Sequence, residues 1–208
     1  MPKGYWIPHI DVRDPDGYRR YMAATPHAHR KYQGIALVRG GRMEVVEGRA
    51  RARVVLREFP DYASALACYR GPEYQGARPL RLATSDGDFV IAEGYDGPQP
   101  SAAPPAPGAR KGYWIGHVDI VDPQAYRAYT AANAVPFGTY GARFLVRGGA
   151  REVVEGAVRG RTVVLQFPSF DAALACYRGP EYQAAKTLRD GKAAIDLVIV
   201  EGYDGPAH

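Results

Sequence analysis

Apolar and polar side chains alternate along residues 113–120, and a period of two is typical of a β-strand. Immediately afterwards, Asp122 and Pro123 supply a helix N-cap and a proline for the first helical turn. Aromatic residues then recur at helical spacing as far as Tyr140, which predicts an amphipathic helix. Because proline lacks the amide hydrogen that a helix needs, Pro136 is expected to kink or split this helix.

The pattern beyond residue 140 predicts further strands and a second helix. The strands are expected at 143–147, 161–167 and 197–201, with an extension at 152–155 that follows a glycine pair. The second helix is expected to begin at Ser169, to break at Gly179-Pro180 and to continue as a short helix to Leu188. The order β-α-β-β-α-β predicts a ferredoxin-like fold, a four-stranded antiparallel sheet with both helices on one face.

The whole pattern is present twice. Residues 3–98 and 111–206 align without a gap at a constant offset of 108, so that ALACYRGPEYQ begins at Ala65 and again at Ala173. We expect one domain at 1–97, a proline-rich linker at 98–110 and a second domain at 111–208. The open sheet face of each repeat can pack on the same face of the other. The predicted fold class is α+β, two ferredoxin-like repeats packed sheet to sheet as a closed pseudo-dimeric α/β barrel.

Composition indicates where such a chain resides. Hydrophobic residues make up 46% of the chain, but no apolar run is long enough to span a membrane, and residues 1–12 do not resemble a secretion signal. We therefore expect a cytoplasmic protein without a membrane partner. Cys68 and Cys176 occupy equivalent positions in the repeats, which predicts reduced, buried thiols and no disulfide within either domain.

Charge argues against a nucleic-acid partner. The net charge of +5 is spread over 208 residues. The densest basic segment, 49–57, has no interleaved aromatic platform on which bases could stack. We predict no nucleic-acid binding. A pseudo-dimer is expected within the chain, and further homo-oligomerisation is left open.

The motifs of each repeat resemble those of one family. KGYWI from Lys111, RFLVRGG from Arg143, ALACYRGPEYQ from Ala173 and the terminal GYDG together resemble the bacterial family called domain of unknown function 1330, within the dimeric α/β-barrel superfamily. The resemblance covers nearly the whole chain, twice. It implies the fold and the pairing mode but no activity, because the superfamily includes cofactor-free monooxygenases, small isomerases, haem-dependent enzymes and ligand sensors.

One strand face is the main candidate for chemistry. Trp114 belongs to the face of strand 113–120 that suits the helices, so the opposite face is expected to point into the barrel. That opposite face carries Tyr113, His117 and Asp119. The same alternation in the next strand brings Arg143 and Arg147 toward His117. An apolar wall with a few convergent polar groups is typical of a small-molecule site.

These residues receive roles as hypotheses. His117, Arg143 and Arg147 are the candidate catalytic residues, because a neutral imidazole is a competent base and arginines can hold a carboxylate or enolate oxygen. The candidate ligand-binding residues are Tyr113, Asp119, Asn133 and His9. His117 is alternatively a buried histidine satisfied by a carbonyl or carboxylate. Asn133 is either a hydrogen bonder at the helix kink or a pocket residue.

The two repeats also support a structural pair and an asymmetry. Arg147 and Glu155 flank a glycine pair, as Arg39 and Glu47 do in the first repeat, and we expect each pair to form an ion pair. The second repeat is expected to hold the pocket richer in polar side chains. The reason is that Asn133 and Arg143 are replaced by Thr25 and Ile35 in the first repeat.

The resulting hypothesis is a protein that binds a small polar or anionic organic ligand in the barrel, between sheet and helices. Catalysis is left undecided; an enzyme would carry out cofactor-independent proton transfer or hydrolysis on a small carbonyl compound. The alternative is a non-catalytic ligand-binding or stress-associated assembly module. No cofactor and no metal are expected, since no phosphate-binding glycine loop or zinc-type ligand spacing is present.

Overall fold

The computed structural model describes residues 1–100 and 110–206. The first repeat contains β1 (Gly4–Val12), α1 (Pro15–Ala24), α2 (Pro26–Lys31), β2 (Ile35–Arg39), β3 (Met43–Glu47), β4 (Arg53–Phe59), α3 (Tyr62–Arg70), α4 (Pro72–Thr84) and β5 (Ser85–Glu93). The second contains β6 (Gly112–Ile120), α5 (Pro123–Ala132), α6 (Ala134–Thr139), β7 (Arg143–Arg147), β8 (Arg151–Glu155), β9 (Arg161–Phe167), α7 (Phe170–Arg178), α8 (Pro180–Thr187) and β10 (Ala193–Glu201). Most of the expected linker, 101–109, lies outside the described residues.

The helices begin and break where the sequence predicts. The carboxylate of Asp122 accepts hydrogen bonds from the backbone amides of Gln124 and Ala125, which caps α5. The predicted split near Pro136 occurs at Asn133, which ends α5 and precedes α6. α8 begins at Pro180, directly after the predicted break. The local signals therefore determine the helices of each repeat.

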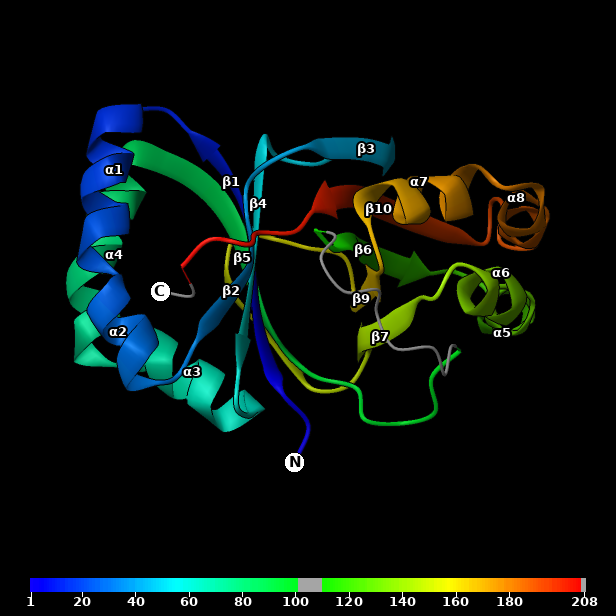
Figure 1. Cartoon of the computed structure of the whole chain (residues 1–208), viewed down its shortest axis with the longest axis horizontal. Coiled ribbons are helices and arrows are strands. Elements are labelled where there is room, and N and C mark those ends of the chain that lie inside the picture. The colour runs from blue at the N-terminus through cyan, green and yellow to red at the C-terminus, as the bar shows by residue number, and fades with distance from the viewer. Residues whose placement is uncertain (101–109, 207–208) are drawn as a thin grey trace.

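Each sheet contains five antiparallel strands, and one strand of each comes from the other repeat. The strand orders are β2-β4-β1-β5-β8 and β3-β10-β6-β9-β7. β3 of the first repeat pairs with β10 of the second, and β8 of the second pairs with β5 of the first. Figure 1 shows β3 reaching away from its own helices toward β10. The expected four-stranded sheets are thus corrected to five-stranded sheets by strand exchange.

Glycines allow the turns that lead into the exchanged strands, and ion pairs attach these strands to the other repeat. Gly148 and Gly149 have φ values of 77° and 102°, a left-handed backbone that turns β8 away from β7 and that favours glycine. On the far sheet, Glu152 of β8 pairs with Arg70 of α3 at 2.6 Å. In the same way Arg178 of α7 pairs with Glu44 at 2.7 Å.

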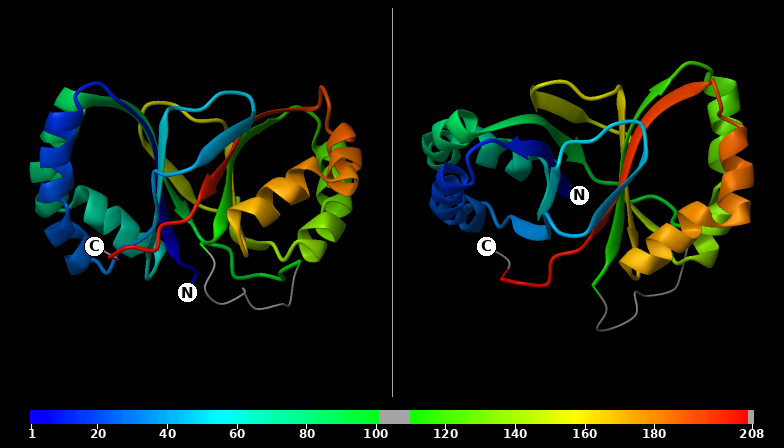
Figure 2. Two further views of the ribbon diagram at one scale, coloured as in Figure 1. Left: turned by 45° about the horizontal axis from the view of Figure 1, so that its top comes forward. Right: turned by 90° about the horizontal axis from the view of Figure 1, so that it is seen from above.

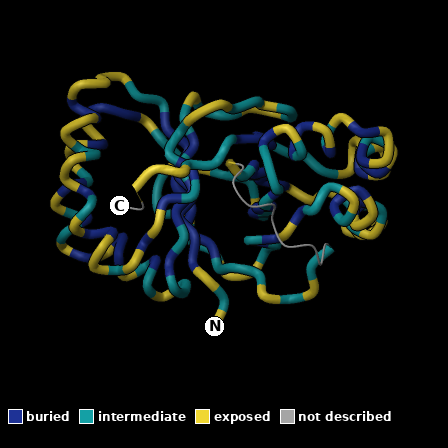
Figure 3. The backbone as a smooth tube through the Cα atoms, viewed as in Figure 1, coloured by how far each residue is buried: buried dark blue, intermediate teal, exposed yellow. Residues whose placement is uncertain are grey.

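The molecule has four layers, with helices on the outside and the two sheets between them (Figure 2). The inter-sheet core is built from aliphatic side chains such as Ile7, Val90 and Val198 together with Tyr5 and Tyr113. Aromatic clusters around Trp6 and Trp114 fill the space between each sheet and its helices. Figure 3 shows the buried strands at the centre and exposed positions along the outer helices.

This architecture confirms the predicted fold class, two ferredoxin-like repeats packed sheet to sheet. The closed barrel is wrong, because the hydrogen bonds define two separate sheets. Cys68 and Cys176 are free and buried, as predicted, and burial raises the pKa of each thiol to about 12. Among the described residues, no helix is long and apolar enough to cross a membrane.

Candidate functional site

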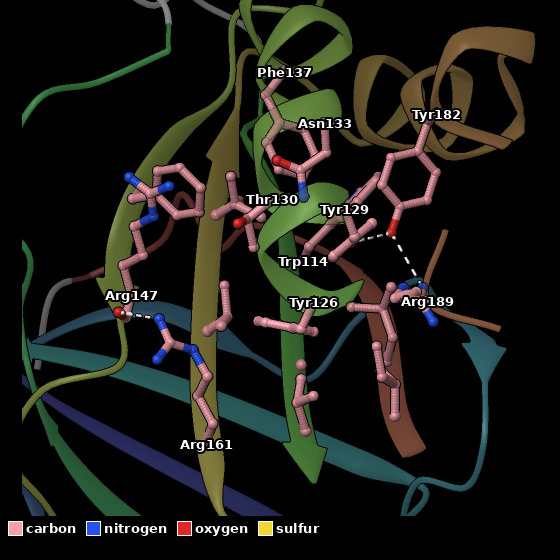
Figure 4. A pocket seen from close by; sticks show the side chains of 17 residues that line it. Trp114, Tyr126, Tyr129, Thr130, Asn133, Phe137, Arg147, Arg161, Tyr182 and Arg189 are labelled. Carbon is pink, nitrogen blue, oxygen red and sulfur yellow. Dashed lines mark hydrogen bonds between the residues drawn. The ribbon is translucent and has the colours of Figure 1, made fainter. Parts of the chain in front are cut away.

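A cavity of about 50 Å³ lies between the second repeat's sheet and its helices (Figure 4). Its aromatic lining consists of Trp114, Tyr126, Tyr129, Phe137, Phe144 and Tyr182. The indole Nε1 of Trp114 donates to the carbonyl of Ala173 at 3.1 Å, which fixes the ring between strand and helix. We call this cavity the second-repeat pocket.

The innermost cation of this pocket is neutralised by the exchanged strand β3. Arg189 is 3% exposed, and its Nη1 and Nη2 donate to the two carboxylate oxygens of Glu47 at 2.9 and 2.5 Å. Burial disfavours the charged guanidinium, but the hydrogen bonds that Arg189 donates to Glu47 outweigh this effect and hold the pKa of Arg189 above its ordinary value. The expected pair of Glu47 with Arg39 is therefore wrong.

The corresponding pair of the second repeat is also wrong. Glu155 binds Arg81 and Arg78 of the first repeat, and Arg147 does not contact it. Instead, Nη1 of Arg147 donates to the hydroxyl of Tyr95 at 3.2 Å. Both errors have one physical cause, since strand exchange carries each glutamate across the molecule into the other repeat.

Two arginines of the second-repeat pocket have no carboxylate partner among the described residues. The guanidinium of Arg147 lies 4.5 Å from the centroid of the Phe144 ring, a cation–π contact. Nη2 of Arg161 donates to the carbonyl of Arg147 at 2.7 Å, while its buried Nε has no acceptor. Neither guanidinium belongs to an ion pair of the described chain, so the pocket carries positive charge that an anion can neutralise.

Asn133 is a pocket residue. Its side chain is 4% exposed, lines the second-repeat pocket and makes no capping hydrogen bond with α6. Figure 4 shows its amide between Phe137 and Thr130 on the helical wall. Of the two alternatives left open by the sequence, the helix-kink hydrogen bond is the one that the geometry does not support.

His117 lies on the opposite face of the sheet, in a central cavity between the repeats. As the alternation of strand β6 predicts, this face points toward the other sheet, and Nε2 of His117 lies 3.0 Å from Nε2 of His9. Its Nδ1 lies 3.2 Å from the hydroxyl of Thr162, so its neighbours are not the carbonyl or carboxylate of the buried-histidine alternative. Burial lowers the pKa of His9 to about 4 and that of His117 well below its ordinary value.

The central cavity is larger than the second-repeat pocket and carries both signs of charge. Its volume is about 520 Å³. Besides the histidine pair, its charged lining consists of Asp11, Arg49, Arg51, Asp88, Arg159 and Asp196. Most of these charges are matched; Arg51, for example, pairs with both Asp11 and Asp88. Among residues 1–100 and 110–206, no cluster of three or more histidine, cysteine or acidic side chains is arranged to hold a metal ion.

The predicted convergence of arginines on His117 does not occur. The register of β7 against β9 shifts between Phe144 and Val146, a bulge that breaks the alternation. Arg147 therefore lies on the helix side with Phe144, whereas Val146 packs between the sheets. Arg143 is exposed near the N-terminal segment. His117 and the two arginines cannot contact one small ligand.

The two remaining candidate residues also lie apart from the second-repeat pocket. Tyr113 is buried in the inter-sheet core, and burial raises the pKa of its phenol above the ordinary value. Asp119 is exposed, accepts a hydrogen bond from the amide of Gly160 at 2.6 Å and pairs with Arg159. These contacts order the loop after β8, so Asp119 has a structural partner already.

Sequence comparison assigns the chain to a family. Residues 3–95 and 111–203 both match the family described as Domain of unknown function (DUF1330). The chain belongs to the DUF1330 family. No curated protein matches it. Among solved structures, the tandem DUF1330 chain resembles a putative monooxygenase from Fusobacterium nucleatum, with 12% identity, a TM-score of 0.56 and coverage of 100% of this chain and 98% of that one.

Other solved structures show the same fold. A chlorite dismutase variant from Candidatus Nitrospira defluvii has 10% identity and a TM-score of 0.56, with 98% of the DUF1330 chain and 91% of the other covered. A putative monooxygenase from Lactobacillus acidophilus has 10% identity and a TM-score of 0.51, with 98% and 100% covered. At such identities the likeness concerns the fold alone, which the DUF1330 tandem shares with proteins of different names.

The first repeat of this DUF1330 chain has its own pocket at the equivalent positions. The volume of this first-repeat pocket is about 60 Å³. It contains Arg57 where the second-repeat pocket has Leu165, and His29 where the other has Phe137. The pockets differ, but the additional cationic side chain is in the first repeat, opposite to the expected direction. Arg143 was part of that expectation and lines neither pocket.

Sequence reasoning missed Arg161 and Arg189 as residues of the second-repeat pocket, and Glu47 as the partner of Arg189. One signal was available: each recurs at the offset of 108, as Arg53, Arg81 and Glu155. A charged residue that is present in both repeats indicates that both repeats need the same contact. It does not say which residues meet, because that depends on the exchanged strands.

Proposed function

We propose that this protein binds a small organic anion, a short-chain carboxylate, in the second-repeat pocket. The observation that carries the proposal is the presence of Arg147 and Arg161 in an aromatic pocket without a carboxylate partner in the described chain. A guanidinium group matches the geometry of a carboxylate, and aromatic walls exclude competing water. The amide of Asn133 supplies a further donor for a carboxylate oxygen.

The size of the pocket limits the ligand. A cavity of about 50 Å³ holds about three water-sized groups, at roughly 15 Å³ for each. A carboxylate with one or two further heavy atoms fills that space without displacing side chains. Binding of this kind needs no cofactor, and it serves a ligand-binding module as well as an enzyme.

Acetate titration followed by NMR tests the proposal. The chain contains two tryptophans, and Trp114 lines the second-repeat pocket whereas Trp6 lines the first-repeat pocket. We expect acetate to shift the indole N–H signal of Trp114. Arg147→Gln is expected to weaken this effect about ten-fold, because it removes one charged hydrogen bond. Arg39→Gln, the matched change in the first repeat, serves as the control. An unchanged Trp114 signal at saturating acetate would contradict the proposal.

A second candidate function is proton transfer by the histidine pair in the central cavity. It is favoured by the low pKa of His9, about 4, which keeps a base neutral at physiological pH. Arg143 and Arg147 take no part, since neither lines that cavity. Hydrogen–deuterium exchange at the methyl group of pyruvate tests it. The candidate requires exchange by the parent chain that is lost in His9→Gln and His117→Gln.

A further inference from the structure

The first-repeat pocket differs from its counterpart in how its innermost cation is neutralised. Arg81 corresponds to Arg189 and is 1% exposed. Glu47 gives both carboxylate oxygens to Arg189, whereas Glu155 offers only Oε1 to Arg81. The same oxygen of Glu155 also accepts from Nε of Arg78 and from the hydroxyl of Tyr69, at 2.8 and 2.6 Å. One carboxylate oxygen therefore serves several donors in the first repeat.

One substitution between the repeats accompanies this difference. The position of Arg78 is occupied by Lys186 in the second repeat, and Lys186 pairs with Asp190, just beyond the end of α8, instead of with Glu47. Arg78 therefore competes for Glu155, but Lys186 leaves Glu47 to Arg189. Nε and Nη1 of Arg81 are buried and have no hydrogen-bond acceptor, whereas in Arg189 only Nε is left without one, because Glu47 accepts from Nη1. Buried donors of this kind require an acceptor, and the described residues supply none.

Further donors surround the same space. Arg39 and Arg53 line the first-repeat pocket and form no ion pair within the described chain, and the buried Nε of Arg53 has no acceptor. Arg57 adds a guanidinium where the second repeat has the apolar Leu165. Of Arg39, Arg53 and Arg81, the last pairs with Glu155, which Arg78 shares, and the other two have no carboxylate partner among the described residues. The first-repeat pocket therefore holds buried guanidinium donors that its glutamate does not satisfy.

We propose that the first-repeat pocket is a separate binding site for a small dianion, with inorganic phosphate as its representative ligand. A tetrahedral dianion presents oxygens in several directions, which suits arginine donors that converge from different strands and helices. A volume of about 60 Å³ holds about four water-sized groups, close to the size of phosphate. This site does not depend on carboxylate binding in the second repeat.

Phosphate titration of the full chain at pH 8 tests the site, because phosphate is then a dianion and the indole signals report each pocket separately. Arg53→Met and Arg161→Met are a matched pair of variants. In the parent chain each arginine donates Nη2 to a carbonyl at the end of the neighbouring strand, Arg39 or Arg147, so each variant loses the same structural contact. Sulfate, a dianion at every working pH, is expected to compete with phosphate.

We expect phosphate to shift the Trp6 indole signal, and we expect Arg53→Met to weaken binding about ten-fold or more while Arg161→Met changes it less than about two-fold. If Arg53→Met does not fold, Arg53→Lys replaces it. A variant that keeps the melting temperature of the parent and binds phosphate more weakly would equally support the proposal. No phosphate effect on Trp6 in the parent, or equal losses in both Met variants, would overturn the proposal. The results for phosphate at Trp6 do not decide whether acetate binds beside Trp114. Each of the two proposals can therefore be contradicted without the other.

Discussion

The two pockets share an aromatic frame and differ in the balance of their charges. Trp6 and Trp114 donate to equivalent carbonyls, those of Ala65 and Ala173, in the two repeats. In the second repeat a glutamate from the other half neutralises one buried arginine with both oxygens. In the first repeat the equivalent glutamate is divided among several donors. The two repeats thus share their aromatic packing, while substitutions between them change the electrostatics of the pockets.

Strand exchange explains which residues stayed constant. Glu47 and Glu155 each leave their own repeat on an exchanged strand and reach a buried arginine of the other one. The GYDG segments behave similarly, because the amide of Tyr95 donates to Leu145 and that of Tyr203 donates to Leu37, both at 2.8 Å. Each repeat therefore supplies the glutamate that pairs with a buried arginine in the other repeat's pocket.

The largest expected effect comes from removing the exchanged glutamates. Glu155→Gln is expected to destabilise the chain by about 3 to 5 kcal/mol, because it leaves buried Arg81 without a carboxylate. Glu47→Gln is expected to cost about 3 kcal/mol through Arg189, since Glu47 accepts hydrogen bonds from this one residue whereas Glu155 accepts from Arg81, Arg78 and Tyr69. Urea unfolding measures both. Variants that unfold like the parent would show that the exchanged strands contribute little to stability.

Because of the histidine pair, we expect the free energy of unfolding to decrease on acidification already between about pH 6.5 and pH 4. The pKa of His9 is about 4 in the folded chain and about 6.5 in an unfolded one. Between these two pKa values the unfolded state binds the proton and the folded state does not. The stabilisation is therefore fully present above about pH 6.5 and is lost as the pH is lowered toward 4. The loss approaches about 3 kcal/mol near pH 4 for His9.

Unfolding free energies measured between pH 7 and pH 4.5 test this dependence. His9→Gln is expected to flatten the slope because it removes the titrating imidazole. The matched change His117→Gln should act similarly, although Thr162 gives His117 a neighbour that His9 lacks, since Val54 occupies the equivalent position. A parent chain whose stability does not change over this range would contradict the buried, neutral pair.

Exchanging one side chain between the pockets sharpens the comparison. Arg57→Leu gives the first repeat the residue of the second, and we expect it to weaken phosphate binding about ten-fold, or about 1.4 kcal/mol. The reverse change, Leu165→Arg, is expected to raise the affinity of the second-repeat pocket for dianions. Calorimetric titration with phosphate measures both. Equal phosphate affinity for parent and Arg57→Leu would exclude Arg57 as a determinant of specificity.

The smallest expected difference concerns the thiols. Cys68 and Cys176 are buried in equivalent environments, and each has a pKa of about 12 because burial disfavours the thiolate. Both are expected to react with a thiol reagent only after denaturant is added, and at equal rates. Rapid labelling of one cysteine in the native chain would reveal a local opening of one repeat that the shared packing does not predict.

The sequence predicted the features that depend on local patterns. Asp122 and Pro123 indicated where a helix begins, and the repeat offset indicated the pairing of the two halves. Asn133 lies on an apolar helical stripe, which is consistent with its burial and its place in the pocket lining, while its role in ligand binding stays a prediction. The sheet face on which Arg147 lies was predicted wrongly, because the bulge at Leu145 inverts the alternation of side chains along β7. No residue type in this segment indicates such a bulge.

The partners of Glu47 and Glu155 were missed for a different reason. The choice between pairing a strand with its own sheet and with the neighbouring sheet is made by tertiary contacts, such as the ion pairs of Arg70 and Arg178. These contacts join residues far apart in the chain. A single sequence records the residues without recording which of them meet.

A crystal structure of the full chain grown with phosphate tests the central claim, the electrostatic difference between the two pockets, most directly. We expect density for a tetrahedral anion among Arg39, Arg53 and Arg81, with Glu155 shared between Arg78 and Arg81. We expect no such density beside Arg189, where Glu47 occupies both terminal nitrogens. Phosphate bound equally in both pockets, or bound only in the second repeat, would contradict it.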